Sequence, residues 1–233
     1  MKKLHALAIP LAAVTLFAQT PKEVEITNEG HHHQVLQNDF VRVFKVEVGP
    51  KDATLMHRHR HDYLYISLGP ADVSNEVEGK SPVQLKLEDG QTGFLPGNFA
   101  HIARNLASTP FRNVTIELMQ NEKARSTPPP KWDEERVLQV LHGGTQEILF
   151  VKDGARVSEI ELQPGGMIPS HSHKGPHLVV AITDLDMRSD IEGRGPTSSQ
   201  SKSGEVKWVP GGYTHTLTNI SKQPAKFVTV EFP

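Results

Sequence analysis

The sequence contains one pattern of residues twice, and this repeat constrains the fold more than any other feature. Arg42 recurs as Arg156, and His57 recurs as His171. Both pairs have the same spacing, because 156 − 42 and 171 − 57 equal 114. The same offset joins the further pairs Val43/Val157, Pro50/Pro164, His59/His173, Gly90/Gly204, Pro96/Pro210, His101/His215, Asn105/Asn219 and Glu117/Glu231. A constant offset without gaps indicates that one domain was duplicated.

The repeat predicts where the domains lie in this chain of 233 residues. We place an N-terminal domain at 21–120, a linker at 121–144 and a C-terminal domain at 145–233. The linker contains Pro128-Pro129-Pro130, which the interior of a helix or a central strand does not accept. The stretch from Trp132 to Leu141 is predicted to form a short helix next to it.

Within each copy the apolar residues follow the pattern of β-strands. Residues 42–48 and 157–162 alternate in polarity, and residues 178–182 form a short apolar run typical of a buried strand. Glycine and proline punctuate these segments at short intervals. Many short strands with regular turns and almost no helix predict an all-β fold, with each copy a sandwich or a closed barrel.

Composition restricts the partners and the metal chemistry. The chain has 27 acidic and 25 basic residues and no long basic run, so nucleic acid is not an expected partner. Cysteine is absent. A metal site would therefore use histidine, a carboxylate or another oxygen ligand.

The first 20 residues are typical of a signal peptide. Lys2 and Lys3 precede an apolar stretch from Leu4 to Ala18, which is shorter than the ~20 residues that a membrane-spanning helix needs. We expect a secreted or periplasmic protein with no membrane span in its mature form. An uncleaved anchor remains the alternative, because Leu16 fits the small-residue rule for cleavage only loosely.

The chain has 13 histidines, and a cluster of them in the C-terminal copy is the main candidate site. His171 and His173 lie two apart on a predicted strand, so both side chains point to one face. A turn at 174–176 begins the next strand at His177, and a turn at 210–212 precedes His215. Four imidazoles at one barrel mouth would suit a divalent Fe, Mn, Co, Ni, Cu or Zn ion. The N-terminal copy keeps His57, His59 and His101.

These histidines and the turns around them resemble the two motifs of the cupin superfamily. The first motif is a glycine, five residues, H-x-H, three or four residues and a glutamate; the second is a glycine, five residues, P-x-G-x-x-H, three residues and an asparagine. The C-terminal copy matches at Gly165, His171, His173, Gly204, Pro210, Gly212, His215 and Asn219, with His177 in place of the glutamate. The N-terminal copy departs at Lys51 and Asn98, and has Tyr63 in place of the glutamate.

The resemblance implies a bicupin, with two tandem double-stranded β-helix (jelly-roll) barrels. It implies one divalent metal in the C-terminal barrel, held by His171, His173, His177 and His215. A second metal in the N-terminal barrel would use His57, His59 and His101. Tyr63 is open as a ligand, a hydrogen-bond donor or core packing, and Trp208 and Tyr213 as pocket lining or barrel wall.

The other polar candidates are expected to be structural. Residues 31–33 are three histidines before the first barrel strand, which we interpret as a solvated segment rather than a metal site. His142 lies in the predicted linker and His61 in a predicted turn. Glu117 and Glu231 end equivalent strands, and we expect them to pair with Arg42 and Arg156.

Two classes of function stay open. The resemblance implies a metal-dependent, dioxygenase-like oxidoreductase that acts on a small anionic or enolic substrate. The missing glutamate leaves metal-dependent hydrolysis or isomerisation open as well. The alternative is a non-catalytic bicupin that binds a small molecule, with one or both barrels structural. Either protein would be a monomer or a homodimer.

Overall fold

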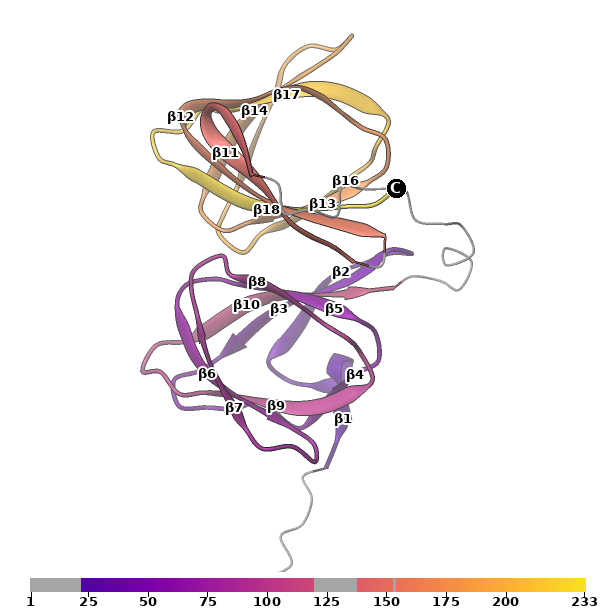
Figure 1. The fold of residues 1–233 in the computed structure, drawn as a ribbon, viewed down its shortest axis with the longest axis vertical. Helices are drawn as coiled ribbons and strands as arrows, with labels where there is room; N and C mark the ends of the chain where they lie inside the picture. Colours follow the sequence, from indigo (N-terminus) through magenta and orange to yellow (C-terminus); the bar gives the residue numbers. More distant parts are fainter. Residues whose placement is uncertain (1–21, 120–137, 153) are drawn as a thin grey trace, which may run out of the picture.

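The computed structural model describes residues 22–119, 138–152 and 154–233, and nearly all of its regular structure is β-strand (Figure 1). The N-terminal barrel contains β1 (Val24–Glu25), η1 (Ile26–Asn28, a 3-10 turn), β2 (His32–Gln37), β3 (Val41–Val48), β4 (His57–His59), β5 (Tyr63–Ser67), β6 (Ala71–Val77), β7 (Val83–Leu87), β8 (Thr92–Leu95), β9 (Phe99–Asn105) and β10 (Phe111–Leu118). The C-terminal barrel contains β11 (Leu138–Lys152), β12 (Ala155–His173), β13 (His177–Ala181), β14 (Leu185–Ile191), β15 (Thr197–Ser201), β16 (Val206–Val209), β17 (Tyr213–Asn219) and β18 (Ala225–Glu231). The prediction of an all-β fold with two jelly-roll barrels is confirmed.

The two barrels have the same topology. In the N-terminal barrel, one sheet has the order β1-β4-β9-β6-β7 and faces a second sheet with the order β2-β3-β10-β5-β8. In the C-terminal barrel the order is β15-β14-β17-β12-β18-β13-β16, with β11 paired to β12. The long β12 corresponds to both β3 and β4 of the N-terminal barrel, so in the C-terminal barrel one continuous strand belongs to both halves.

The strand boundaries repeat with the offset found in the sequence. Strand β5 begins at Tyr63 and β13 at His177, and 177 − 63 = 114. Strand β9 begins at Phe99 and β17 at Tyr213, with the same difference. The duplication therefore holds in the strand register, and equivalent residues can be compared one by one.

The predicted linker is wrong at its C-terminal end. Residues 138–144, including His142, belong to β11, which pairs antiparallel with β12. The helix expected up to Leu141 is wrong for residues 138–141, because hydrogen bonding to a sheet edge outweighs a weak local helix preference. The rest of that segment, with its proline run, lies outside the described residues, as does the predicted signal peptide. Among the described residues, no helix is long and apolar enough to cross a membrane.

The two barrels pack against each other through their β-sheets (Figure 1). One apolar core combines residues of both, such as Val43 and Ile116 with Val157 and Val230. This contact is approximately two-fold symmetric, because the equivalent glycines Gly90 and Gly204 each face an equivalent residue of the other barrel. A Cβ at Gly90 would lie 2.9 Å from Ile182, and a Cβ at Gly204 would lie 2.9 Å from Leu68, the equivalent of Ile182.

The interiors of the two barrels differ in how they are filled. Phe44, Phe111 and Ile26 are buried inside the N-terminal barrel. Their equivalents at an offset of 114 are Ser158, Ala225 and the exposed Val140. Other exchanges work in the opposite direction, since Ile168, Leu217 and Phe227 lie where the N-terminal barrel has Thr54, Ala103 and Asn113. The two interiors therefore differ in where their bulky apolar residues lie.

Candidate metal centre

Three histidines converge inside the C-terminal barrel. Strand β12 carries His171 and His173, and β17 carries His215, which is the register partner of His171. Their Nε2 atoms form a triangle with separations of 3.1 Å (171–173), 3.2 Å (173–215) and 3.0 Å (215–171). The fold thus brings the Nε2 atoms of three predicted ligands close together.

The opposite ring nitrogens show which atoms carry the protons. Nδ1 of His171 donates to the carbonyl oxygen of Pro169 at 2.8 Å, and Nδ1 of His173 donates to the carboxylate of Glu231 at 3.0 Å. Since these oxygens only accept, the Nε2 atoms of both neutral rings carry lone pairs. Nδ1 of His215 lies 2.7 Å from the hydroxyl of Ser189.

This donor set fits a divalent metal ion. The Nε2 atoms of His171 and His173 are 3.1 Å apart with no proton between them, so their lone pairs repel unless a cation lies there. Nitrogens about 2.1 Å from one ion lie about 3.0–3.2 Å apart when their angles at the ion are about 90–100°, as on one face of an octahedron. Such a set leaves other coordination positions open.

Burial favours the neutral form of His171 and His215. Burial, together with the neighbouring His171 and His173, lowers the pKa of His215 to about 3. The pKa of His171 is lowered as well, chiefly by burial. Because a neutral imidazole is the form that ligates, no proton competes with a metal at neutral pH.

Glu231 connects the cluster to the barrel wall. Its second carboxylate oxygen accepts from Nε of Arg156 at 2.8 Å, so the expected pairing of Arg156 with Glu231 is present, as is that of Arg42 with Glu117. Burial raises the pKa of Glu231, but the hydrogen bond from His173 and the charge of Arg156 outweigh it and lower the pKa to about 2. The contact with His173 was missed in the sequence; the only signal for it was the recurrence of glutamate at the end of both copies.

His177 lies beside the cluster rather than in it. Its ring stacks on that of His173, with centroids 4.0 Å apart and planes 20° apart. The group of mutually close ring nitrogens comprises His171, His173 and His215 without it. Burial, aided by the proximity of His173, lowers its pKa to about 4. Nδ1 is buried without a hydrogen-bond partner among the described residues.

The cluster borders a cavity of about 590 Å³ inside the C-terminal barrel. Apolar walls come from Leu141, Ile160, Ile168, Met187, Leu217 and Phe227. Tyr213 lines the cavity, which is one of the two roles left open for it. Trp208 does not line this cavity. Its neighbours Lys207 and Val209 point inward, so alternation along β16 turns Trp208 outward, against Phe40 and Phe232 between the barrels.

The N-terminal barrel brings together the equivalent histidines. The ring centroids of His57, His59 and His101 are 5.1, 4.5 and 5.2 Å apart, against 4.8, 4.4 and 5.2 Å in the C-terminal set. The Nε2 atoms of His57 and His101 are buried and have no hydrogen-bond partner in the part of the chain that the structure describes. Tyr63 stacks on His59 at 3.9 Å, as His177 does on His173, which supports core packing.

One of the three consecutive histidines is misassigned as solvated. His32 is 9% exposed, and one of its ring nitrogens lies within 4.8 Å of ring nitrogens of both His57 and His59. His33 on the same strand is exposed, because side chains of a strand alternate between its faces. A glutamate three residues before His32 was the signal available in the sequence.

Comparisons with known proteins support the fold. No protein-family model and no curated protein match this sequence. Among solved structures, a variant of oxalate decarboxylase from Bacillus subtilis aligns with a TM-score of 0.61 and 12% identity, over 83% of this chain and 69% of that chain. A structure of the same enzyme described for its Mn(II) centres aligns with a TM-score of 0.60 and 13% identity, over 83% of this chain and 69% of that chain. The formate complex of oxalate decarboxylase from Lactobacillus farciminis aligns with a TM-score of 0.61 and 13% identity, over 84% of this chain and 78% of that chain. At these identities the likeness concerns the fold, over both barrels.

Proposed function

We propose that this chain is a bicupin of the cupin superfamily and that its C-terminal barrel is a metal-dependent oxidoreductase site for a small enolic or anionic substrate. The observation that carries this proposal is the triangle of Nε2 atoms of His171, His173 and His215 at the wall of an internal cavity. Three neutral ligands leave the full charge of a divalent ion available to an anionic substrate. When bound, a metal such as Fe or Mn would supply redox chemistry and a site for an enolate oxygen.

The cavity indicates the kind of substrate. Its volume of about 590 Å³ and its apolar walls suit a molecule with an apolar body. Lys207 and Arg194 also line it and add positive charge to that of the metal. A two-carbon dianion such as oxalate would leave the apolar walls without a partner. We therefore propose an enol, a diketone or a catechol-like substrate, rather than the substrate of the structural neighbours.

The side chains around the ligands have separate roles. Glu231 fixes the ring of His173 through Nδ1, which raises the basicity of the nitrogen facing the metal. Ser189 and the carbonyl of Pro169 orient the other two rings. His177 lines the cavity with a ring that is not among the three converging ligands, so it is available to contact a substrate there.

Elemental analysis of the purified protein, followed by oxygen-uptake measurements, tests the proposal. We expect a transition metal in the C-terminal barrel that the double variant His171→Ala/His173→Ala lacks. Oxygen uptake with a panel of enols, diketones and catechols should depend on added Fe(II) or Mn(II) and vanish in that variant. The matched control is His57→Ala/His59→Ala, which removes the equivalent ligands from the other barrel and should retain turnover.

Two results would redirect the proposal. A C-terminal barrel without metal after expression in metal-replete medium would overturn it. Bound metal without turnover, but with saturable binding of a panel compound, would favour the non-catalytic binding protein instead.

We also propose export to the periplasm or the cell exterior. The charged and apolar pattern of residues 1–20 supports it. The mass of the mature protein, recovered from the periplasm or medium, would show whether this segment is removed.

A further inference from the structure

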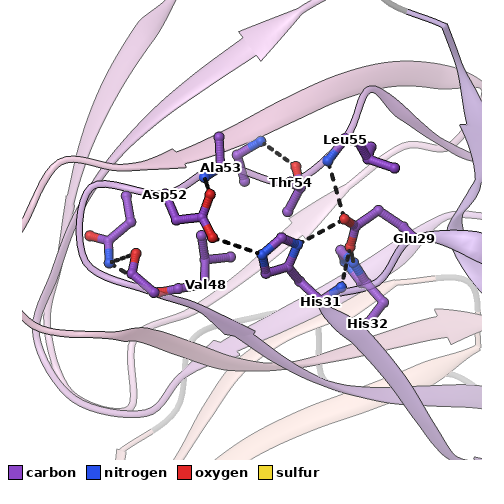
Figure 2. Close-up of polar contacts among 11 residues, drawn as sticks. Glu29, His31, His32, Val48, Asp52, Ala53, Thr54 and Leu55 are labelled. Carbon is purple, nitrogen blue, oxygen red and sulfur yellow. Dashed lines mark hydrogen bonds and ion pairs between the residues drawn. The ribbon is translucent and has the colours of Figure 1, made fainter.

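A carboxylate inside the N-terminal barrel organises the segment before β2 (Figure 2). The side chain of Glu29 is fully buried. One of its oxygens accepts from Nδ1 of His32 at 2.6 Å, and the other accepts from the backbone N–H of Leu55 at 3.1 Å and from Nδ1 of His31 at 2.9 Å. These donors hold the pKa of Glu29 well below its usual value, although burial alone would raise it. Glu29 is thus a buried anion that orients His32.

The hydrogen bond to Glu29 leaves the other nitrogen of His32 free to ligate. Since Nδ1–H donates a hydrogen bond to the carboxylate, Nε2 carries a lone pair in the neutral form of the ring. The ring of His32 lies 4.6 Å from that of His57 and 6.3 Å from that of His59, between centroids. His32 therefore approaches the N-terminal triad from β2, a strand outside both histidine motifs.

All four rings are buried, whereas only one ring of the C-terminal triad is. His32, His57, His59 and His101 are 9%, 0%, 1% and 8% exposed; His215 is 7% exposed, but His171 and His173 are half-buried beside the cavity. The Nε2 atoms of His57 and His101 are buried without hydrogen-bond partners among the described residues, which is unfavourable unless an ion satisfies them. Four nitrogen ligands complete the coordination that structural zinc sites use.

The C-terminal barrel provides an internal comparison. At an offset of 114, Glu29 corresponds to Gly143 and His32 to Gln146. Both barrels pair these segments in the same register, since His32 is opposite Val46 and Gln146 opposite Ile160. The Glu29–His32 pair is therefore a property of the N-terminal barrel alone, and Gln146 lines the cavity that His32 would close.

We propose that His32 is a ligand of a closed, structural metal site in the N-terminal barrel and is oriented by Glu29. The ring nitrogens of His32, His57 and His59 lie close to one another, and His101 completes the site from β9, with its ring centroid 4.5 Å from that of His57. The ion would be a divalent transition metal, with Zn²⁺ the best match to four neutral imidazoles. This site is separate from the C-terminal site and does not depend on its activity.

Cobalt binding to the full chain tests the proposal, in the background His171→Ala/His173→Ala, which leaves only the N-terminal site. We expect one Co(II) per chain, with the intense visible absorption of four-coordinate cobalt and no change when azide is added. His32→Gln, which introduces the residue of the other barrel, should weaken cobalt binding and make the spectrum sensitive to azide. Glu29→Gln should lower the affinity about 10–100-fold, as expected for loss of an outer hydrogen-bond partner.

His33→Gln is the matched control, because His33 is exposed on the same strand. It should change neither stoichiometry nor spectrum. The proposal is overturned if the parent background binds no cobalt, if its spectrum is that of a six-coordinate ion, or if His32→Gln binds cobalt as tightly as His33→Gln does. The spectrum of the parent background decides the matter even if His32→Gln does not fold. Failure of this site would leave the metal content of the C-terminal barrel unaffected.

Discussion

Replacing Glu231 with glutamine should weaken metal binding in the C-terminal barrel without changing a ligand. Glu231 accepts from His173 at 3.0 Å and from Arg156 at 2.8 Å, through different oxygens. A glutamine of the same size has one accepting oxygen and one donating nitrogen, so it serves only one of these donors. In the variant, either His173 or Arg156 therefore loses its hydrogen-bond acceptor at this side chain.

The expected loss follows from the role of the outer partner. Loss of a hydrogen-bond acceptor behind a ligating histidine typically lowers metal affinity 10–100-fold, or about 1.4–2.7 kcal/mol. The equivalent change Glu117→Gln should have a smaller effect on the N-terminal site, because Nδ1 of His59 lies 3.6 Å from Glu117. It should have no effect on the C-terminal site.

The assay is titration of metal-free protein with Mn(II) or Zn(II) in competition with a chromophoric chelator at constant pH. The double variant His57→Ala/His59→Ala is the background, so that only one site is measured. Affinity of Glu231→Gln within threefold of the background, in a protein that unfolds at the same denaturant concentration, would refute the role given to Glu231.

Three further predictions concern stability. Lys51 and Asn98 have the left-handed backbone conformation (φ 62° and 65°) of their glycine equivalents, and lysine tolerates this conformation less well than asparagine does. Lys51→Gly should therefore stabilise the protein by up to about 1 kcal/mol, measured by urea unfolding, and Asn98→Gly should stabilise it less. Asn219 is buried and donates to three backbone carbonyls, so Asn219→Ala should cost about 1–3 kcal/mol by the same assay, and an unchanged midpoint would contradict this. Burial lowers the pKa of His57 to about 3, so the unfolded chain binds this proton first as pH falls. In metal-free protein His57 should alone contribute a loss of about 1.4 kcal/mol per pH unit below about pH 6.5, so His57→Gln should lose stability less steeply than the parent protein between pH 7 and 5.

The sequence predicted the features that depend on repeated local patterns. The constant offset predicted two equivalent barrels, and alternation along a strand placed His171 and His173 on one face. The pairing of Arg42 with Glu117 was inferred because both residues recur. Even the positions that lost their glycines keep the turn, since Lys51 adopts the conformation of Gly165.

The features that depend on distant contacts could not be predicted. Whether His32 points inward depends on the register of β2 against β3 and on the burial of Glu29, and three adjacent histidines show neither. The family's glutamate position suggested that His177 would ligate, but stacking on His173 determines its place. The extent of β11 could not be predicted from the local sequence, because this strand is stabilised by its pairing with β12.

The two copies diverge in a way that separates binding from stability. In one barrel, bulky Phe44 and Phe111 fill the interior and His32 approaches the triad. In the other, Ser158, Ala225 and Gln146 stand at the same register, and a cavity reaches the triad. Because the barrels share one apolar interface, a rigid N-terminal barrel would stabilise the sheet against which the hollow barrel packs. A cavity removes packing contacts and lowers stability, so a filled, metal-closed twin offsets the stability that an open site loses.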